Sequence, residues 1–173
     1  TEIPHGSRNT KQISDYLVSF AINHDLSFVQ DNSNNVVIYK PATPGYENAP
    51  TVILQGHMDM VCAKCPEIEH DFTKDGLKLV VKDGFLSAEG TTLGGDDGIA
   101  VAYGLALLDS TDLPHPTLEV VFTVDEETGL LGADGFDCSL LKGRRMINLD
   151  SEKEGCLWVS CAGGVAGNSY LPV

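Results

Sequence analysis

Four segments of the chain carry histidine or carboxylate side chains in patterns suited to metal chemistry. The first is Gly56-His57-Met58-Asp59, and the others contain Asp96-Asp97, Asp125-Glu126-Glu127 and Asp150. Imidazole and carboxylate groups together form a ligand set for Zn²⁺, with Mn²⁺ or Co²⁺ as alternatives. So many anionic groups in one place would repel one another unless cations neutralised them. The four segments therefore predict a metal centre if the fold brings them together.

Each cluster also has a simpler interpretation when it stands alone. His57 and Asp59 form a common tripeptide pattern, and Asp96-Asp97 could complement the dipole at the start of a helix. Asp125-Glu126-Glu127 could be a solvated loop, and Asp150 could belong to a turn. These interpretations do not explain why all four clusters stand at the end of an apolar element. We therefore interpret them as parts of one site.

Apolar strands and a helix are predicted next to these clusters. Residues 51–55 form a predicted buried strand, and residues 118–124 and 146–149 form two more. The continuous apolar run of 118–124 is typical of a strand covered on both faces. A glycine-rich loop at 90–98 precedes an apolar, buried helix at 99–108. Because ligands bind outside the carboxyl ends of the strands in an open α/β sheet, the clusters would meet there.

The rest of the chain predicts smaller elements around this core. Apolar residues recur at helical spacing over 13–21, and the turn-forming residues 31–35 precede a short strand. Asp83-Gly84 predicts a hairpin between 77–81 and 85–88, and 157–161 reads as a further strand. The alternation of strands and helices predicts an α/β fold: a mostly parallel sheet with helices on both faces, and a small antiparallel hairpin.

Composition argues against several classes of function. The 173 residues include 25 acidic and 11 Lys or Arg residues, giving a formal net charge of −14 that would repel nucleic acids and anionic membranes. The longest apolar stretch, 98–108, is too short for a membrane span of about 20 residues. The five irregularly spaced cysteines predict reduced thiols in a cytoplasmic protein. With 42% hydrophobic residues the chain can bury a core.

Four motifs, taken in order, resemble those of the co-catalytic zinc peptidases, a family that includes acetylornithine deacetylase, carnosinase and carboxypeptidase G. The motifs are GHMDMV at 56–61, GTTLGGD at 90–96, EETG at 126–129 and NLDSE at 148–152. Within this family the chain is most similar to the aminoacyl-histidine dipeptidases. The resemblance implies two-metal hydrolysis of small peptides, with Xaa-His dipeptides as the first candidate substrates. Other N-acyl amino acids or tripeptides are the alternative substrates.

The resemblance also implies which residues hold the metal ions. His57 and Asp150 would bind the first zinc ion, Glu127 would bind the second, and Asp96 would bridge the two. Asp97 remains the alternative to Asp96 as the bridging ligand. Manganese or cobalt could replace zinc in the same ligand set.

Two further residues receive catalytic roles from the resemblance. Asp59 would orient the imidazole of His57 and raise its basicity. Glu126 would be the general base that takes a proton from the water held between the metal ions and passes it to the leaving amine.

Members of this family are longer than this chain. Their last zinc ligand is a distant histidine, and an inserted second domain carries the dimer contacts. We therefore expect residues 1–173 to be the N-terminal part of a catalytic domain, with the lid or dimerisation domain and the C-terminal catalytic half absent. Such a piece would be inactive alone, or a non-catalytic metal-binding module, while the full-length protein would be a homodimer. His5 or His70 could replace the missing ligand.

Overall fold

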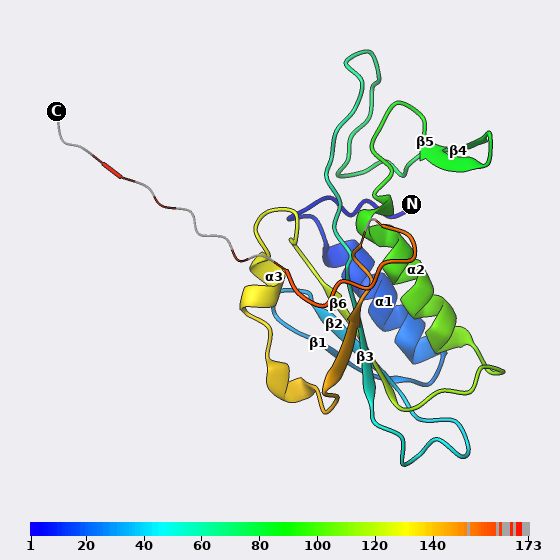
Figure 1. The fold of residues 1–173 in the computed structure, drawn as a ribbon. Helices are drawn as coiled ribbons and strands as arrows, with labels where there is room; N and C mark the ends of the chain where they lie inside the picture. The colour runs from blue at the N-terminus through cyan, green and yellow to red at the C-terminus, as the bar shows by residue number, and fades with distance from the viewer. Residues whose placement is uncertain (152, 162, 164–166, 168, 171–173) are drawn as a thin grey trace.

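The computed structural model describes residues 1–151, 153–161, 163, 167 and 169–170. A five-stranded sheet with the order β1-β2-β6-β3-β7 forms the body, and a separate hairpin of β4 and β5 projects from it (Figure 1). The strands are β1 (Ser27–Gln30), β2 (Val36–Lys40), β3 (Val52–His57), β4 (Leu79–Lys82), β5 (Phe85–Ala88), β6 (Leu118–Thr123) and β7 (Arg145–Asn148). The helices are α1 (Lys11–Asn23), α2 (Gly95–Asp109), α3 (Leu131–Asp134) and the 3₁₀ turn η1 (Cys138–Leu140).

The five-stranded sheet is mixed, which corrects the prediction of a mostly parallel sheet. Strand β6 pairs in parallel with β3, and β3 pairs in parallel with β7. In contrast, β1 pairs antiparallel with β2, and β2 pairs antiparallel with β6. The tight turn at 31–35 joins β1 to β2 directly, and such a short connection can only join antiparallel strands. The predicted hairpin is confirmed, with Lys82 paired to Phe85 across the Asp83-Gly84 turn.

Helices lie on both faces of the sheet, as predicted, but both long helices cover the same face. Figure 1 shows α1 and α2 side by side, with the short α3 and η1 on the opposite side of the sheet. The main core lies under α1 and α2, where Leu17 and Val101 pack with Phe122 of β6. On the other face a smaller cluster around Val121 is covered by Phe136, which follows α3.

Close packing of α2 on the sheet depends on small residues. A Cβ atom on Gly104 would lie 2.9 Å from the Phe122 ring and 3.0 Å from a Val120 methyl group.

At the C-terminal end of α2, the Lys40 ammonium donates hydrogen bonds to the carbonyls of Leu107 and Leu108 at 2.8 and 3.0 Å. This lysine caps the helix because its positive charge meets the negative end of the helix dipole.

The strand predicted at 157–161 is not formed. These residues have no regular secondary structure, and the side chains of Leu157 and Val159 are 92% and 96% exposed. In the part of the chain that the structure describes, these residues have no partner strand and no covering layer, so their apolar side chains gain nothing from pairing in a sheet. Glu152 of the fourth motif lies outside the described residues. In the described part of the chain, no helix is long and apolar enough to cross a membrane.

Candidate metal centre

The candidate site lies at the carboxyl ends of three parallel strands. His57 is the last residue of β3, Glu126 and Glu127 follow the end of β6, and Asp150 stands two residues after β7. Helix α2 begins beside them with Gly95 and carries Asp96 and Asp97 in its first turn. The parallel pairing of β6, β3 and β7 brings these segments to the same edge of the sheet.

The imidazole of His57 is buried, with only 1% of its surface exposed. Its Nδ1 atom lies 3.0 Å from the main-chain oxygen of Asp59 and 3.3 Å from the Asp59 carboxylate. Its Nε2 atom lies 3.0 Å from Asp96 Oδ1 and 4.0 Å from Glu126 Oε2. The Nδ1 side therefore faces fixed protein oxygens, and the Nε2 side faces the carboxylates that a metal ion would share.

Asp59 joins three segments through its buried carboxylate. Besides facing His57, it accepts hydrogen bonds from the Ser7 hydroxyl at 2.8 Å and from the Glu126 main-chain N–H at 3.1 Å. Burial alone would raise the pKa of Asp59, but hydrogen bonds from His57, Ser7 and Glu126 outweigh it and lower the pKa below its usual value. The sequence gives no indication of the role of Ser7, which lies in no motif.

The neighbours Asp96 and Asp97, joined by a cis peptide bond, have different surroundings. Asp97 is 1% exposed, and its carboxylate accepts the main-chain N–H of His57 at 3.1 Å. Its burial, with a smaller contribution from nearby carboxylates, raises its pKa to about 6. The side chain of Asp96 is 62% exposed and meets Nε2 of His57. Of the two candidates for the bridging ligand, Asp96 is thus the one whose carboxylate faces the open site.

A glycine makes room for the start of α2. A Cβ atom on Gly56 would lie 2.4 Å from the Ala100 Cβ and 2.6 Å from the Asp97 carboxylate. Neither separation is attainable without moving the helix. Gly56 therefore allows α2 to approach β3 closely enough for Asp97 to reach the His57 main chain.

Two groups of side chains in the described part of the chain have donor atoms close enough to hold a metal ion. One consists of His57, Asp96 and Asp150, and the other of His57, Glu126 and Glu127, with all donor atoms of a group within 4.8 Å of one another. The first group contains the residues that the resemblance implies for the first zinc ion. Nitrogen and carboxylate donors in this arrangement fit Zn²⁺. Neither group includes His5 or His70, the proposed substitutes for a missing ligand.

The charges around His57 also favour a cation. Burial tends to lower the pKa of His57, but its hydrogen bonds to Asp59 and Asp96 outweigh this effect and raise the pKa to about 9. Burial raises the pKa of Glu126 and Glu127, and neighbouring carboxylates add to the rise. Burial and mutual repulsion both disfavour the charged form of these carboxylates. A divalent cation would neutralise the repulsion and stabilise the charged form.

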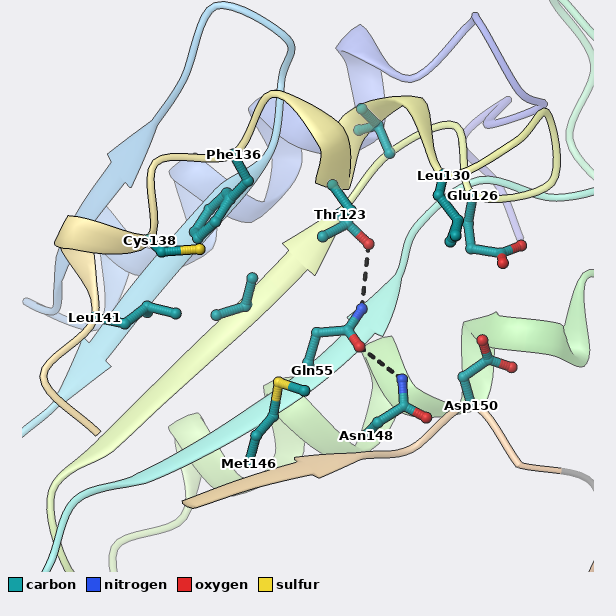
Figure 2. A pocket seen from close by; sticks show the side chains of 13 residues that line it. Gln55, Thr123, Glu126, Leu130, Phe136, Cys138, Leu141, Met146, Asn148 and Asp150 are labelled. Atoms are coloured by element: carbon teal, nitrogen blue, oxygen red, sulfur yellow. Dashed lines mark hydrogen bonds between the residues drawn. The ribbon is translucent and has the colours of Figure 1, made fainter. Parts of the chain in front are cut away.

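A pocket of about 260 Å³ opens beside the candidate ligands (Figure 2). Glu126 and Asp150 stand at one end with Leu130 beside Glu126, and Phe136 and Leu141 lie at the opposite end (Figure 2). Along its floor the Asn148 amide donates to Gln55 Oε1 at 2.6 Å, and the Gln55 amide donates to the Thr123 hydroxyl at 3.2 Å. This chain of hydrogen bonds crosses β7, β3 and β6 and holds their carboxyl ends in register. A small organic molecule could lie next to both carboxylates.

Comparisons with known proteins agree with the motifs. The model of peptidase family M20/M25/M40 matches residues 53–156. The chain is 41% identical over 169 residues to the cytosol non-specific dipeptidase of Escherichia coli K12, covering 98% of this chain and 35% of that protein. Among solved structures it is similar to aminoacylhistidine dipeptidase from Vibrio alginolyticus, with a TM-score of 0.87, 43% identity, and coverage of 89% of this chain and 31% of that one.

A tripeptidase from Staphylococcus aureus is more distant, with a TM-score of 0.72, 26% identity, and coverage of 88% of this chain and 41% of the tripeptidase. The chain spans about a third of the length of the two dipeptidases. The order of the motifs, the parallel strand ends that carry them and the family match lead to one conclusion. This chain belongs to peptidase family M20/M25/M40.

Proposed function

We propose that this chain forms part of the active site of a metal-dependent dipeptidase whose substrates are Xaa-His dipeptides. The observation that carries the proposal is the gathering of Asp96, Asp150, Glu126 and Glu127 around the single imidazole of His57. The names of the two similar dipeptidases support a dipeptide substrate. The name of one supports histidine as the second residue, while the name of the other, non-specific dipeptidase, supports a wider range of dipeptides.

The metal ligands in this proposal are four side chains. His57, Asp96 and Asp150, whose donor atoms form one group, would hold one Zn²⁺ ion. Asp96 and Glu127 would hold a second, as the family resemblance implies, with Mn²⁺ or Co²⁺ as alternatives. Two divalent ions would polarise the scissile carbonyl and lower the pKa of the attacking water. Any further ligand of the second ion would come from a longer protein in which residues 1–173 are the N-terminal part of the catalytic domain.

The chain's own residues would move the proton and hold the geometry. Glu126, whose side chain is 30% exposed, faces the pocket. It accepts a proton from the attacking water while the water oxygen bonds to the carbonyl carbon of the substrate. The same carboxyl group then gives the proton to the leaving amine nitrogen as the C–N bond breaks. Asp59 holds His57 through Nδ1, so that Nε2 keeps its direction.

A tripeptide is the second candidate substrate, because the S. aureus tripeptidase shares this fold at lower identity. The higher identity to the two dipeptidases favours the dipeptide. We further propose that the full-length protein works in the cytoplasm as a homodimer. The name of the E. coli relative supports this location.

The proposal is tested by comparing two adjacent glutamates in the full-length protein. The metal-free enzyme is reconstituted with Zn²⁺ and assayed on an Xaa-His dipeptide, another dipeptide, a tripeptide and an N-acetyl amino acid. Glu126→Gln should lower kcat by about 10²- to 10⁴-fold and leave zinc stoichiometry unchanged. Glu127→Gln should instead reduce the bound zinc. Unchanged turnover in Glu126→Gln, or full activity after chelation, would overturn the mechanism.

The chain of 173 residues provides a second test. Zinc binding by the metal-stripped chain is measured for the wild type and for Asp96→Ala. Binding of one or two ions that is lost with Asp96 would support the proposed ligands. Binding that does not depend on Asp96 would contradict them, and hydrolysis by the full-length protein would then have to rely on another set of ligands.

A further inference from the structure

The loop that carries Glu126 and Glu127 closes on itself at a narrow neck. It leaves the sheet at Val124 and reaches α3 at Gly132, and the Gly132 N–H donates to the Val124 carbonyl at 3.1 Å. A Cβ atom on Gly132 would lie 2.3 Å from that carbonyl oxygen, so the neck has no room for a side chain. Compact loops whose ends meet in this way are frequently functional.

The side chain of Asn35 bonds to both ends of this neck. Asn35 is 1% exposed and immediately precedes β2. Its Oδ1 atom accepts the Val124 N–H at 3.0 Å, and its Nδ2 group donates to the Gly132 carbonyl at 2.9 Å. One buried amide thus replaces the ladder partners that the main chain loses where the loop leaves the sheet.

Asp31 fixes the orientation of the Asn35 amide. Its Oδ2 atom accepts a hydrogen bond from Asn35 Nδ2 at 2.7 Å, and its Oδ1 atom accepts the Asn35 main-chain N–H at 2.9 Å. Because an ionised carboxylate only accepts hydrogen bonds, the NH₂ group of Asn35 must face Asp31. The carbonyl oxygen of the amide is then left for Val124, as observed.

The loop is also held on its other side, where Asp59 accepts the Glu126 N–H at 3.1 Å. The two tethers come from different segments and fix the loop at its neck and next to the general base. We propose that Asn35 is a positioning residue of the active site, which keeps Glu126 and Glu127 within reach of His57. This inference rests on the proposed function, and it adds a residue outside the metal ligands and their direct partners.

Ser14→Ala is a matched control for Asn35→Ala. Ser14 is fully buried, and its hydroxyl donates to the Asn34 carbonyl at 2.7 Å, so it secures the same turn without touching the glutamate loop. Asn35→Asp keeps an acceptor for Val124, but it places a carboxylate oxygen against the Asp31 carboxylate and the Gly132 carbonyl, where the amide had donated. All three variants are made in the full-length protein and loaded with Zn²⁺. The melting temperature of each is measured, so that losses of kcat can be compared with losses of stability.

We expect Asn35→Ala to lower kcat by about 10- to 100-fold, the usual effect of losing support behind metal-site residues, with KM changed less than about twofold. Hydrogen exchange of the amides in 124–132 should become faster in Asn35→Ala and at least as fast in Asn35→Asp, because the new carboxylate repels Asp31 and the Gly132 carbonyl. Ser14→Ala should change neither the hydrogen exchange of the 124–132 amides nor kcat by more than about twofold, even if its melting temperature falls as much as that of Asn35→Ala.

Two results would overturn the inference. The first is hydrogen exchange of the 124–132 amides in Asn35→Ala at the wild-type rate. The second is a loss of kcat in Ser14→Ala as large as that in Asn35→Ala for the same fall in melting temperature. Failure of the proposed function is seen separately, as a wild-type protein that neither binds Zn²⁺ nor hydrolyses peptides. In that case the exchange data alone decide whether Asn35 holds the loop.

Discussion

Asp59 provides a quantitative test of how the site is held together. Replacing it by alanine leaves the Ser7 hydroxyl and the Glu126 N–H without their acceptor. An unpaired buried donor costs roughly 1–3 kcal/mol, but Ser7 and Glu126 are half-buried, so Asp59→Ala should lower the free energy of unfolding by about 1–3 kcal/mol in total. The His57 ring keeps one partner on its Nδ1 side, because the main-chain oxygen of Asp59 remains 3.0 Å away.

Asparagine at the same position should behave differently. Its carbonyl oxygen can accept the Glu126 N–H, and its amide can donate to Ser7, because a hydroxyl both donates and accepts. Asp59→Asn should therefore lose less than about 1 kcal/mol of stability. It removes the negative charge beside His57, however, and zinc affinity should fall by about 10- to 100-fold.

Urea denaturation of the metal-free proteins and zinc competition titrations separate the two effects. Ser7→Ala, which removes one donor and leaves the carboxylate, is the control and should cost about 1 kcal/mol. If Asp59→Asn is as unstable as Asp59→Ala, the hydrogen bonds assigned to Asp59 do not explain its contribution. If Asp59→Asn retains wild-type zinc affinity, its charge is not needed to orient or polarise His57.

Three other substitutions test contacts that hold α2 and the sheet in place. Gly56→Ala should destabilise the protein by about 1–3 kcal/mol, because its Cβ overlaps α2, whereas the control Gly98→Ala has open space and should be neutral or stabilising in chemical denaturation. Lys40→Met leaves the carbonyls at the C-terminal end of α2 uncapped and should lower the free energy of unfolding by about 1 kcal/mol. Amide hydrogen exchange in the last turn of α2 should become faster, and unchanged exchange there would contradict the capping role. Glu119→Ala removes the buried carboxylate that accepts the N–H groups of Lys142 and Gly143, and a loss of about 2–4 kcal/mol is expected in urea melts, while a loss below 1 kcal/mol would refute this anchor.

The strands that carry the site could be predicted because their pattern is local. The predicted strands at 51–55, 118–124 and 146–149 are short, largely apolar runs followed by polar or glycine residues, and they overlap β3, β6 and β7. The predicted meeting of their carboxyl ends agrees with the grouping of His57, Asp96 and Asp150. The assignment of those three residues as zinc ligands stays a prediction that the zinc titrations address.

In the antiparallel half of the sheet, the strand after the turn at 31–35 was predicted and forms β2, but β1 was missed because its pattern is weak. Strand β1 has four residues, Ser27–Gln30, and none of them is fully buried. Such an edge strand depends on its pairing with β2 more than on its own sequence. The position of both long helices on one face is likewise decided by tertiary packing, since apolar spacing shows which side of a helix is buried but not which face of the sheet it covers.

The distinction between Asp96 and Asp97 also depends on tertiary structure. Two adjacent residues of the same type carry no information in sequence about which one turns inward. The buried N–H of His57 draws in Asp97, and Asp96 is left facing Nε2. The same holds for Glu119, a single charged residue in an apolar strand, whose burial was unexpected. Its partners are main-chain N–H groups more than 20 residues away.

Metal ligands and the residues that hold them in place differ in how visible they are in a sequence. His57 and Glu126 stand in motifs at the ends of strands, where they can be noticed in the sequence. Ser7 and Asn35 are of residue types that are common in turns, so they attract no notice. What distinguishes Ser7 and Asn35 is contact with Asp59 and with the glutamate loop. Because the site carboxylates repel one another without a cation, the loop needs Asn35, and Asp59 supported by Ser7, to keep its glutamates near His57. Substitutions at these tethers should therefore weaken metal binding and catalysis while every ligand remains in the chain.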